Sequence, residues 1–105
     1  MKYQVIRTDV ADAMIREIVL YIAENFGNNV AIKKLDELER EILSLGDNPY
    51  IGTAPKYNIL KRQGYLVLIL EKDIVFYKIN EEKKIVTIYA VVDHRQDYLS
   101  IIQGL

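Results

Sequence analysis

Side chains suited to proton transfer or anion binding stand together near the C-terminus, in the stretch VVDHRQDYLSII of residues 91–102. His94 is the only histidine of the chain, and an imidazole accepts and releases protons near neutral pH. Arg95 follows it, and a guanidinium binds phosphate or carboxylate through parallel hydrogen bonds. The stretch predicts either a reactive cluster or a strand-to-helix turn, in which His94 is partly exposed and Arg95 pairs with Asp93 or Asp97.

Basic and aromatic residues further back in the chain form a second candidate surface. Lys61 and Arg62 lie in the segment LKRQGY, and two more lysines could join them on one face: Lys56 and Lys78. Four tyrosines could stack on nucleic-acid bases: Tyr57, Tyr65, Tyr77 and Tyr89. The alternative is that the charges are solvated strand ends and that the tyrosines pack at the edge of a core.

Composition excludes several classes of site. The 105 residues contain no cysteine, so disulfides and thiolate metal sites are excluded, and we expect no metal and no cofactor. The length suits one domain over residues 1–105, and no apolar run is long enough to span a membrane. A soluble, cytoplasmic protein is predicted.

Charge is spread unevenly along the chain. The formal net charge is −1, which argues against a protein that grips a phosphate backbone through bulk positive charge. Residues 1–50 carry six basic and nine acidic side chains, whereas residues 51–105 carry eight basic and six acidic ones. An anionic partner is therefore expected to meet the second half.

The first half of the chain predicts a strand followed by two helices. Residues 2–7 alternate like a strand. Thr8 or Asp9 can cap a first helix that ends near Gly27, with apolar residues at helical spacing: Ala11, Met14, Ile15, Ile18, Tyr21 and Ile22. Asn28 or Asn29 can cap a second helix, whose apolar stripe is Ala31, Leu35, Leu38, Ile42 and Leu45. So short a connection predicts an antiparallel helix hairpin.

The second half changes to a strand pattern. Residues 46–58 hold both prolines and predict a loop, and three β-rich runs follow: YLVLIL, IVFYKI and KIVTIYAVV. Because YLVLIL is apolar throughout, we expect it to be a central strand. Tyr98, Ile101 and Ile102 predict a last helix with Asp93 as its N-cap. The predicted class is α+β, in the order β-α-α-β-β-β-α, with the helix hairpin packed on a mostly antiparallel four-stranded sheet and a short C-terminal helix.

Several segments in this order resemble the RelE/ParE superfamily of bacterial toxins: NPYIG, LKRQGY, IVFYKI and VVDHRQDYLSII. The resemblance extends from about Tyr3 to Ile102. It implies the toxin of a type II toxin–antitoxin pair, inhibited by an antitoxin whose tail wraps it. ParE-like members of the superfamily poison DNA gyrase, whereas RelE-like members cleave mRNA in the ribosome without a metal.

The resemblance also indicates which branch to expect. RelE-like members carry basic residues on two central strands, and the corresponding positions are here apolar: Leu66, Leu68, Leu70 and Ile74. Arg95 matches the family arginine after the last strand, and Tyr98 lies near the position of its terminal tyrosine. We therefore expect a ParE-like toxin that binds its target, such as DNA gyrase, through Arg95, Lys61 and Arg62.

Two alternatives stay open at this point. In an endoribonuclease acting on ribosome-bound mRNA, Arg95 and Arg62 would hold phosphate, and His94 or Tyr98 would transfer protons. A relative that has lost toxicity would bind only the antitoxin. In each case the terminal segment SIIQGL is expected to expose an apolar strip in which Ile101 and Ile102 contact the antitoxin.

Overall fold

The computed structural model describes residues 2–94 and 96–105 and contains the predicted elements in the predicted order. The predicted loop contains one short helix, and a second short helix begins at the last residue of that loop and leads towards the second strand. The elements are β1 (Gln4–Arg7), α1 (Asp9–Phe26), α2 (Asn28–Ser44), η1 (Pro49–Ile51), α3 (Asn58–Arg62), β2 (Leu66–Ile69), β3 (Asp73–Asn80), β4 (Ile85–Asp93) and α4 (Tyr98–Gln103). The α+β class is confirmed.

The four strands form one mixed sheet in the order β1-β4-β3-β2. β2, β3 and β4 are antiparallel neighbours, while β1 pairs in parallel with β4. The prediction of a central position for YLVLIL is therefore wrong, because β2 is an edge strand. Its apolar character has another cause: Leu68 packs on the hairpin side and Val67 on the other side, and Thr53 pairs with Val67 along the outer edge, while Ile69 is 60% exposed.

The helix hairpin begins and turns largely as predicted. The Thr8 hydroxyl accepts a hydrogen bond from the Ala11 amide at 3.1 Å, so Thr8 caps α1. Gly27 separates the two helices with a φ of 96°, which a glycine adopts without strain. Gly27 is also the N-cap of α2, so the prediction of an asparagine cap is wrong.

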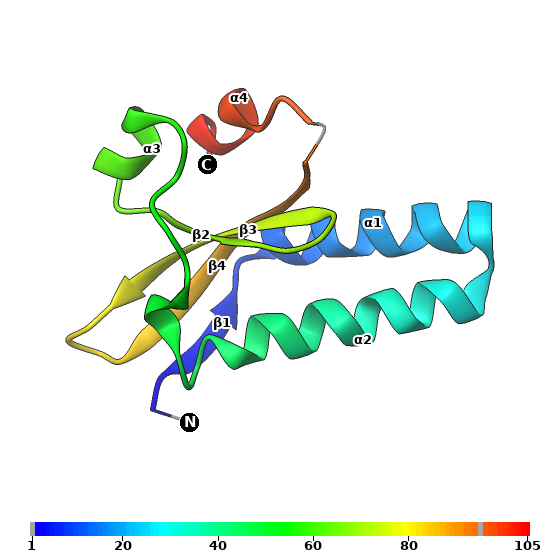
Figure 1. Ribbon diagram of the computed structural model, residues 1–105, viewed down its shortest axis with the longest axis horizontal. Helices are drawn as coiled ribbons and strands as arrows, with labels where there is room; N and C mark the ends of the chain where they lie inside the picture. The colour runs from blue at the N-terminus through cyan, green and yellow to red at the C-terminus, as the bar shows by residue number, and fades with distance from the viewer. Residues whose placement is uncertain (1, 95) are drawn as a thin grey trace.

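The hairpin covers one face of the sheet and then extends past it (Figure 1). Ala11 and Ile15 of α1 are buried, as are Leu38 and Ile42 of α2. The Tyr21 side chain, predicted to lie in the buried stripe, is 59% exposed. It belongs to the part of α1 that projects beyond the strands, where helical spacing no longer implies burial.

The sheet is packed between two apolar layers. On the hairpin side the strands contribute Leu68, Val75, Tyr77, Val86, Ile88 and Val91. On the other side, which we call the α4 face, they contribute Val67, Ile74, Phe76, Ala90 and Val92, and Tyr65 joins this layer from the position just before β2. Leu60 of α3 and Ile102 of α4 complete that second layer, so the short helices are packed parts of the fold.

One irregularity in the sheet redirects an aromatic side chain. The register of β3 and β4 shifts between Phe76, which pairs with Ala90, and Tyr77, which pairs with Ile88. Tyr89 is left as the extra residue of a β-bulge. It packs against the α4 layer beside Tyr65.

The C-terminal helix begins later than predicted. β4 continues to Asp93, and the N-cap of α4 is Asp97. The predicted capping role of Asp93 is therefore wrong, because four residues separate it from the start of the helix at Tyr98.

Candidate functional site

His94 lies exposed at the end of β4 and is bonded to the β2–β3 turn. Its amide donates to the Lys72 carbonyl at 3.1 Å, and its ring Nε2 lies 2.9 Å from the Leu70 carbonyl oxygen. Because a carbonyl only accepts hydrogen bonds, Nε2 carries the proton in this contact. Nδ1 is the ring nitrogen that remains for base chemistry, so the geometry supports an anchoring role for the histidine.

The same turn is held from the opposite face by an ion pair. Lys34 of α2 reaches Asp73 at the start of β3. Asp73 is only 3% exposed and is the one charged residue that is buried in the described part of the chain. A buried carboxylate needs such a partner, so the hairpin and the β2–β3 turn are joined at this point.

Tyr98 is half-buried and packs through its ring. The ring centroid lies 5.6 Å from that of Tyr57 and 5.2 Å from that of Phe76. These contacts fix the start of α4 on the sheet. Arg95, predicted as a target contact and as a catalytic candidate, lies outside the described residues.

The predicted basic residues all belong to the side of the sheet covered by α3 and α4. Lys61 and Arg62 are exposed in the last turn of α3. The Lys56 amine lies 5.5 Å from the centre of the Tyr57 ring, and Lys78 is half-buried on β3. In the part of the chain that the structure describes, none of these four forms an ion pair, so their positive charges are not neutralised by neighbouring carboxylates.

The four predicted tyrosines divide between the two faces of the sheet. Tyr57, Tyr65 and Tyr89 belong to the α4 face. Tyr77 is fully buried under the hairpin, where its hydroxyl donates to the Pro49 carbonyl at 2.6 Å and accepts from the Gly52 amide at 3.1 Å. Burial raises the pKa of Tyr77, and this tyrosine is a core residue that cannot stack on a base.

Four apolar positions correspond to the basic positions of RelE-like nucleases, and these four also divide between the two faces of the sheet. Leu66, Leu68 and Leu70 pack under the hairpin, whereas Ile74 belongs to the α4 face. Leu68 is buried and Leu66 and Leu70 are half-buried on the hairpin side, so their lack of charge says nothing about the opposite face. The informative surface is the α4 face, where Lys78 is the single charged side chain on the described strands and Val67, Ile74 and Phe76 are buried.

The two residues predicted to bind an antitoxin have different environments. Ile102 is 1% exposed and belongs to the core under α4, while Ile101 is half-buried beside it. As the chain is folded here, Ile102 is not part of a surface strip.

A surface that sequence reasoning missed lies along the hairpin. A groove of about 350 Å³ has an apolar lining formed by Ile15, Val19, Leu20 and Leu35. Arg7 stands at its rim and pairs with Asp12 through an Nε–Oδ1 distance of 2.8 Å. Neither Val19 nor Leu20 was in the predicted stripe, and Leu20 is 53% exposed.

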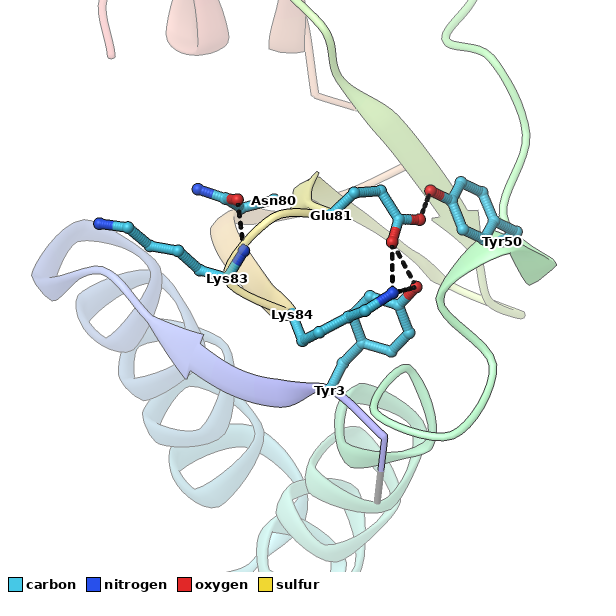
Figure 2. Close-up of polar contacts among 6 residues, drawn as sticks. All are labelled: Tyr3, Tyr50, Asn80, Glu81, Lys83 and Lys84. Atoms are coloured by element: carbon cyan, nitrogen blue, oxygen red, sulfur yellow. Dashed lines mark hydrogen bonds and ion pairs between the residues drawn. The ribbon is translucent and has the colours of Figure 1, made fainter.

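A second missed feature is a polar cluster around Glu81, shown in Figure 2. The carboxylate accepts hydrogen bonds from the Tyr3 hydroxyl at 2.6 Å, from the Tyr50 hydroxyl, and from the Lys84 amine at 3.0 Å. The hydrogen bonds from Tyr3, Tyr50 and Lys84 lower the pKa of Glu81 to about 2. The hydrogen bond to Glu81 raises the pKa of Tyr50 to about 12.

The arrangement of a helix hairpin, a four-stranded sheet and a C-terminal helix is shared with solved toxin structures. A chain from the chromosomal ParDE system of P. aeruginosa has 17% identity and a TM-score of 0.73, covering 88% of this chain and 96% of that one. A chain of the RelBE2 toxin–antitoxin complex of Mycobacterium tuberculosis has 20% identity and a TM-score of 0.65, covering 90% of this chain and 100% of that one. The isolated RelE toxin of E. coli has 15% identity and a TM-score of 0.58, covering 97% of this chain and 96% of that one.

The sequence identifies the family within this fold. Residues 5–98 match the model of the ParE toxin of the type II toxin–antitoxin system parDE. The chain therefore belongs to the ParE family of toxins of type II toxin–antitoxin systems. No curated protein matches the sequence significantly. In the described residues, none of the helices has the length and apolar character needed to cross a membrane.

Proposed function

We propose that this chain is a toxin that acts by binding and inhibiting DNA gyrase, without cleaving RNA, and that a cognate antitoxin neutralises it. The observation that carries the proposal is the composition of the α4 face. Its strands present buried apolar side chains such as Val67, Ile74 and Phe76, with Lys78 as the one charge on the described strands of that face.

Metal-free RNA cleavage needs several positive groups around the phosphate in the transition state. Removing even one such electrostatic donor typically lowers a rate by ~10²–10³. His94 is the obvious proton carrier, but its Nε2 is bonded to a carbonyl. On the α4 face the described strands contribute one cation, Lys78, and the other predicted cations lie off the strands, on α3 and in the segment before it.

In this proposal the exposed cations Lys61 and Arg62 of α3 contact the target, together with Arg95 from the segment that follows β4. The antitoxin covers apolar surface beside α4, where Ile101 is the accessible member of the predicted pair. Lys61, Arg62 and Ile101 belong to α3 and α4, on the side of the sheet away from the hairpin (Figure 1).

The RelE-like alternative is favoured by one observation, the presence of Lys78 on the α4 face. An endoribonuclease would have to take its phosphate contacts from Lys56, Lys61, Arg62 or Lys78, and its proton transfer from His94 Nδ1 or Tyr98. Of these groups only Lys78, on β3, lies on a central strand of the sheet, so the others would have to act from helices or loops.

The test combines growth with two biochemical assays. Expression of the chain alone is expected to arrest bacterial growth, and co-expression of the adjacent reading frame to restore it. Purified protein should inhibit supercoiling by gyrase or trap broken DNA, and should leave ribosome-bound mRNA intact. Arg95→Ala should abolish the gyrase effect with little change in melting temperature, whereas Lys83→Ala, in the exposed β3–β4 turn, should keep it.

Discrete mRNA cuts that disappear in Arg95→Ala or His94→Ala would contradict the proposal in favour of the ribonuclease. Normal growth with abundant folded protein would instead indicate a relative that only binds an antitoxin. A large fall in the melting temperature of Arg95→Ala would assign the arginine a structural role.

A further inference from the structure

Lys78 has an unusual environment for a strand lysine. Its amine lies 4.5 Å from the centre of the Tyr65 ring and 5.1 Å from that of Tyr89. The two rings are perpendicular, at 89°, with centroids 5.6 Å apart. The faces of aromatic rings attract cations, so the two tyrosines hold the ammonium group at a defined position on the sheet.

This cation has no anionic partner in the described chain. Lys84 pairs with Glu81 and Lys34 pairs with Asp73, but no ion pair of Lys78 is found among residues 2–94 and 96–105. The described strand residues that share its face contribute no carboxylate. Contacts with the two rings lower the free-energy cost of holding a partly buried ammonium group. They do not give its N–H donors a charged acceptor, with which such donors form their strongest hydrogen bonds.

Lys78 is half-buried on β3, so part of its side chain reaches the surface on the α4 face. Lys78 pairs with Thr87 towards the turn, and Thr87 in turn lies beside Ile6 of β1. Ile6 is 41% exposed, so an accessible apolar side chain lies on the same face of the sheet, two strands from Lys78.

We propose that Lys78, held by Tyr65 and Tyr89, receives a carboxylate of the antitoxin polypeptide on the α4 face of the sheet. The inference rests on the proposed function, since it assigns a contact to the partner that neutralises the toxin. One fixed cation, with an exposed isoleucine two strands away on the same face, matches an acidic side chain on an apolar segment. A nucleic acid would require a row of cations along its phosphates, and the described strands offer a single one here.

The charge and the packing of Lys78 can be separated by two substitutions. Lys78→Met keeps an unbranched apolar side chain against the rings and removes the charge, whereas Lys78→Arg keeps the charge. Lys83→Met is the matched control, because Lys83 is exposed in the neighbouring turn and its side chain points away from the Glu81 cluster in Figure 2. The probe is the purified product of the adjacent reading frame, titrated by calorimetry at low and at high salt.

Lys78→Met is expected to weaken antitoxin binding about tenfold or more, as loss of a charge-assisted hydrogen bond does. It should also flatten the dependence of the dissociation constant on salt. Lys78→Arg should keep most of the affinity, and Lys83→Met should match the wild type. The thermal midpoint of each variant shows whether the fold is intact.

If a folded Lys78→Met variant bound the antitoxin with wild-type affinity, this inference would be overturned and the proposed function would be unaffected. Loss of binding to a short single-stranded oligonucleotide in Lys78→Met, with antitoxin binding unchanged, would also overturn it and would identify a nucleic-acid contact. A wild-type chain that binds no antitoxin and arrests no growth would contradict the proposed function itself.

Discussion

At the scale of single residues, Gly52 occupies a position that has no room for a side chain. A Cβ atom built at this position would lie 2.3 Å from the Tyr77 hydroxyl oxygen and 2.6 Å from the Val67 carbonyl oxygen. The same tyrosine hydroxyl bonds Pro49 and the Gly52 amide. Gly52 therefore allows the loop before α3 to close onto β2 and onto the buried tyrosine.

Gly52→Ala is expected to destabilise the protein by about 1–3 kcal/mol, the usual cost of overpacking a well-packed site. The reason is that the loop must move away from Tyr77 and loosen the pairing of Thr53 with Val67. Urea unfolding followed by circular dichroism measures the change. Gly104→Ala is the matched control, since its Cβ would meet nothing closer than 3.6 Å. Equal midpoints for both variants would contradict the steric argument.

His94 shows which properties of a residue can be predicted from its type and which cannot. Its chemistry made it a candidate base, and its position at a strand end was predictable. The bond between Nε2 and the Leu70 carbonyl was not, because it depends on how β2 and β4 are placed on either side of β3. The hydrogen-bond partners of such a residue depend on which distant segments the sheet brings together.

At the scale of elements, α4 is a short helix whose two isoleucines have different roles. Ile102 enters the apolar layer below the helix, while Ile101 lies at its margin. Helical spacing predicted the pair but did not separate them. The separation follows from the rotation of α4 on the sheet, which Tyr98 fixes through its contacts with Tyr57 and Phe76.

Ile102→Glu is expected to lower the free energy of unfolding by about 3 kcal/mol or more, because it places a charge in an apolar site without a partner. Ile101→Glu should cost much less stability and should weaken antitoxin binding more than it changes the circular dichroism. Chemical denaturation and titration with the antitoxin measure the two effects. Equal loss of stability in both variants would show that Ile101 also belongs only to the core.

At the scale of the whole molecule, the Glu81 cluster joins parts of the chain that are far apart in sequence. Tyr3 precedes β1, Tyr50 lies in η1, and Glu81 and Lys84 belong to the β3–β4 turn (Figure 2). The folded state therefore brings three donors to one carboxylate, which the unfolded chain does not. Since the groups are at the surface, solvent screening limits the energy of each contact.

The cluster predicts how stability depends on pH. The pKa of Glu81 falls from 4.5 in the unfolded reference to about 2 in the fold. A lowered pKa means that the stabilisation is present above pH 4.5 and is lost as the pH falls towards 2. Glu81→Gln should therefore be less stable than the wild type at neutral pH, and the difference should vanish near pH 2.

Urea titrations at a series of pH values measure this difference. Glu82→Gln, which changes the exposed neighbour in the same turn, serves as the control and should follow the wild type at every pH. A gap between Glu81→Gln and the wild type that stays constant down to pH 2 would mean that the carboxylate charge is not its cause.

Local patterns in the sequence determined the order of the main elements, the hairpin with its Thr8 cap and Gly27 turn, and the α+β class. These features depend on side-chain periodicity and on backbone preferences over a few residues. For the same reason the resemblance to a toxin superfamily could be recognised from the order and spacing of short motifs, and the family match supports it.

Only the tertiary structure decided the edge position of β2, the burial of Ile102 and Tyr77, and the meeting of Lys78 with Tyr65 and Tyr89. An apolar run covered on both faces shows no alternation, so its place in a sheet cannot be read from its composition. The bulge at Tyr89 and the strand order arise from hydrogen bonds between segments distant in sequence. Those long-range pairings determine which side chains share a face, and local sequence carries no signal of them.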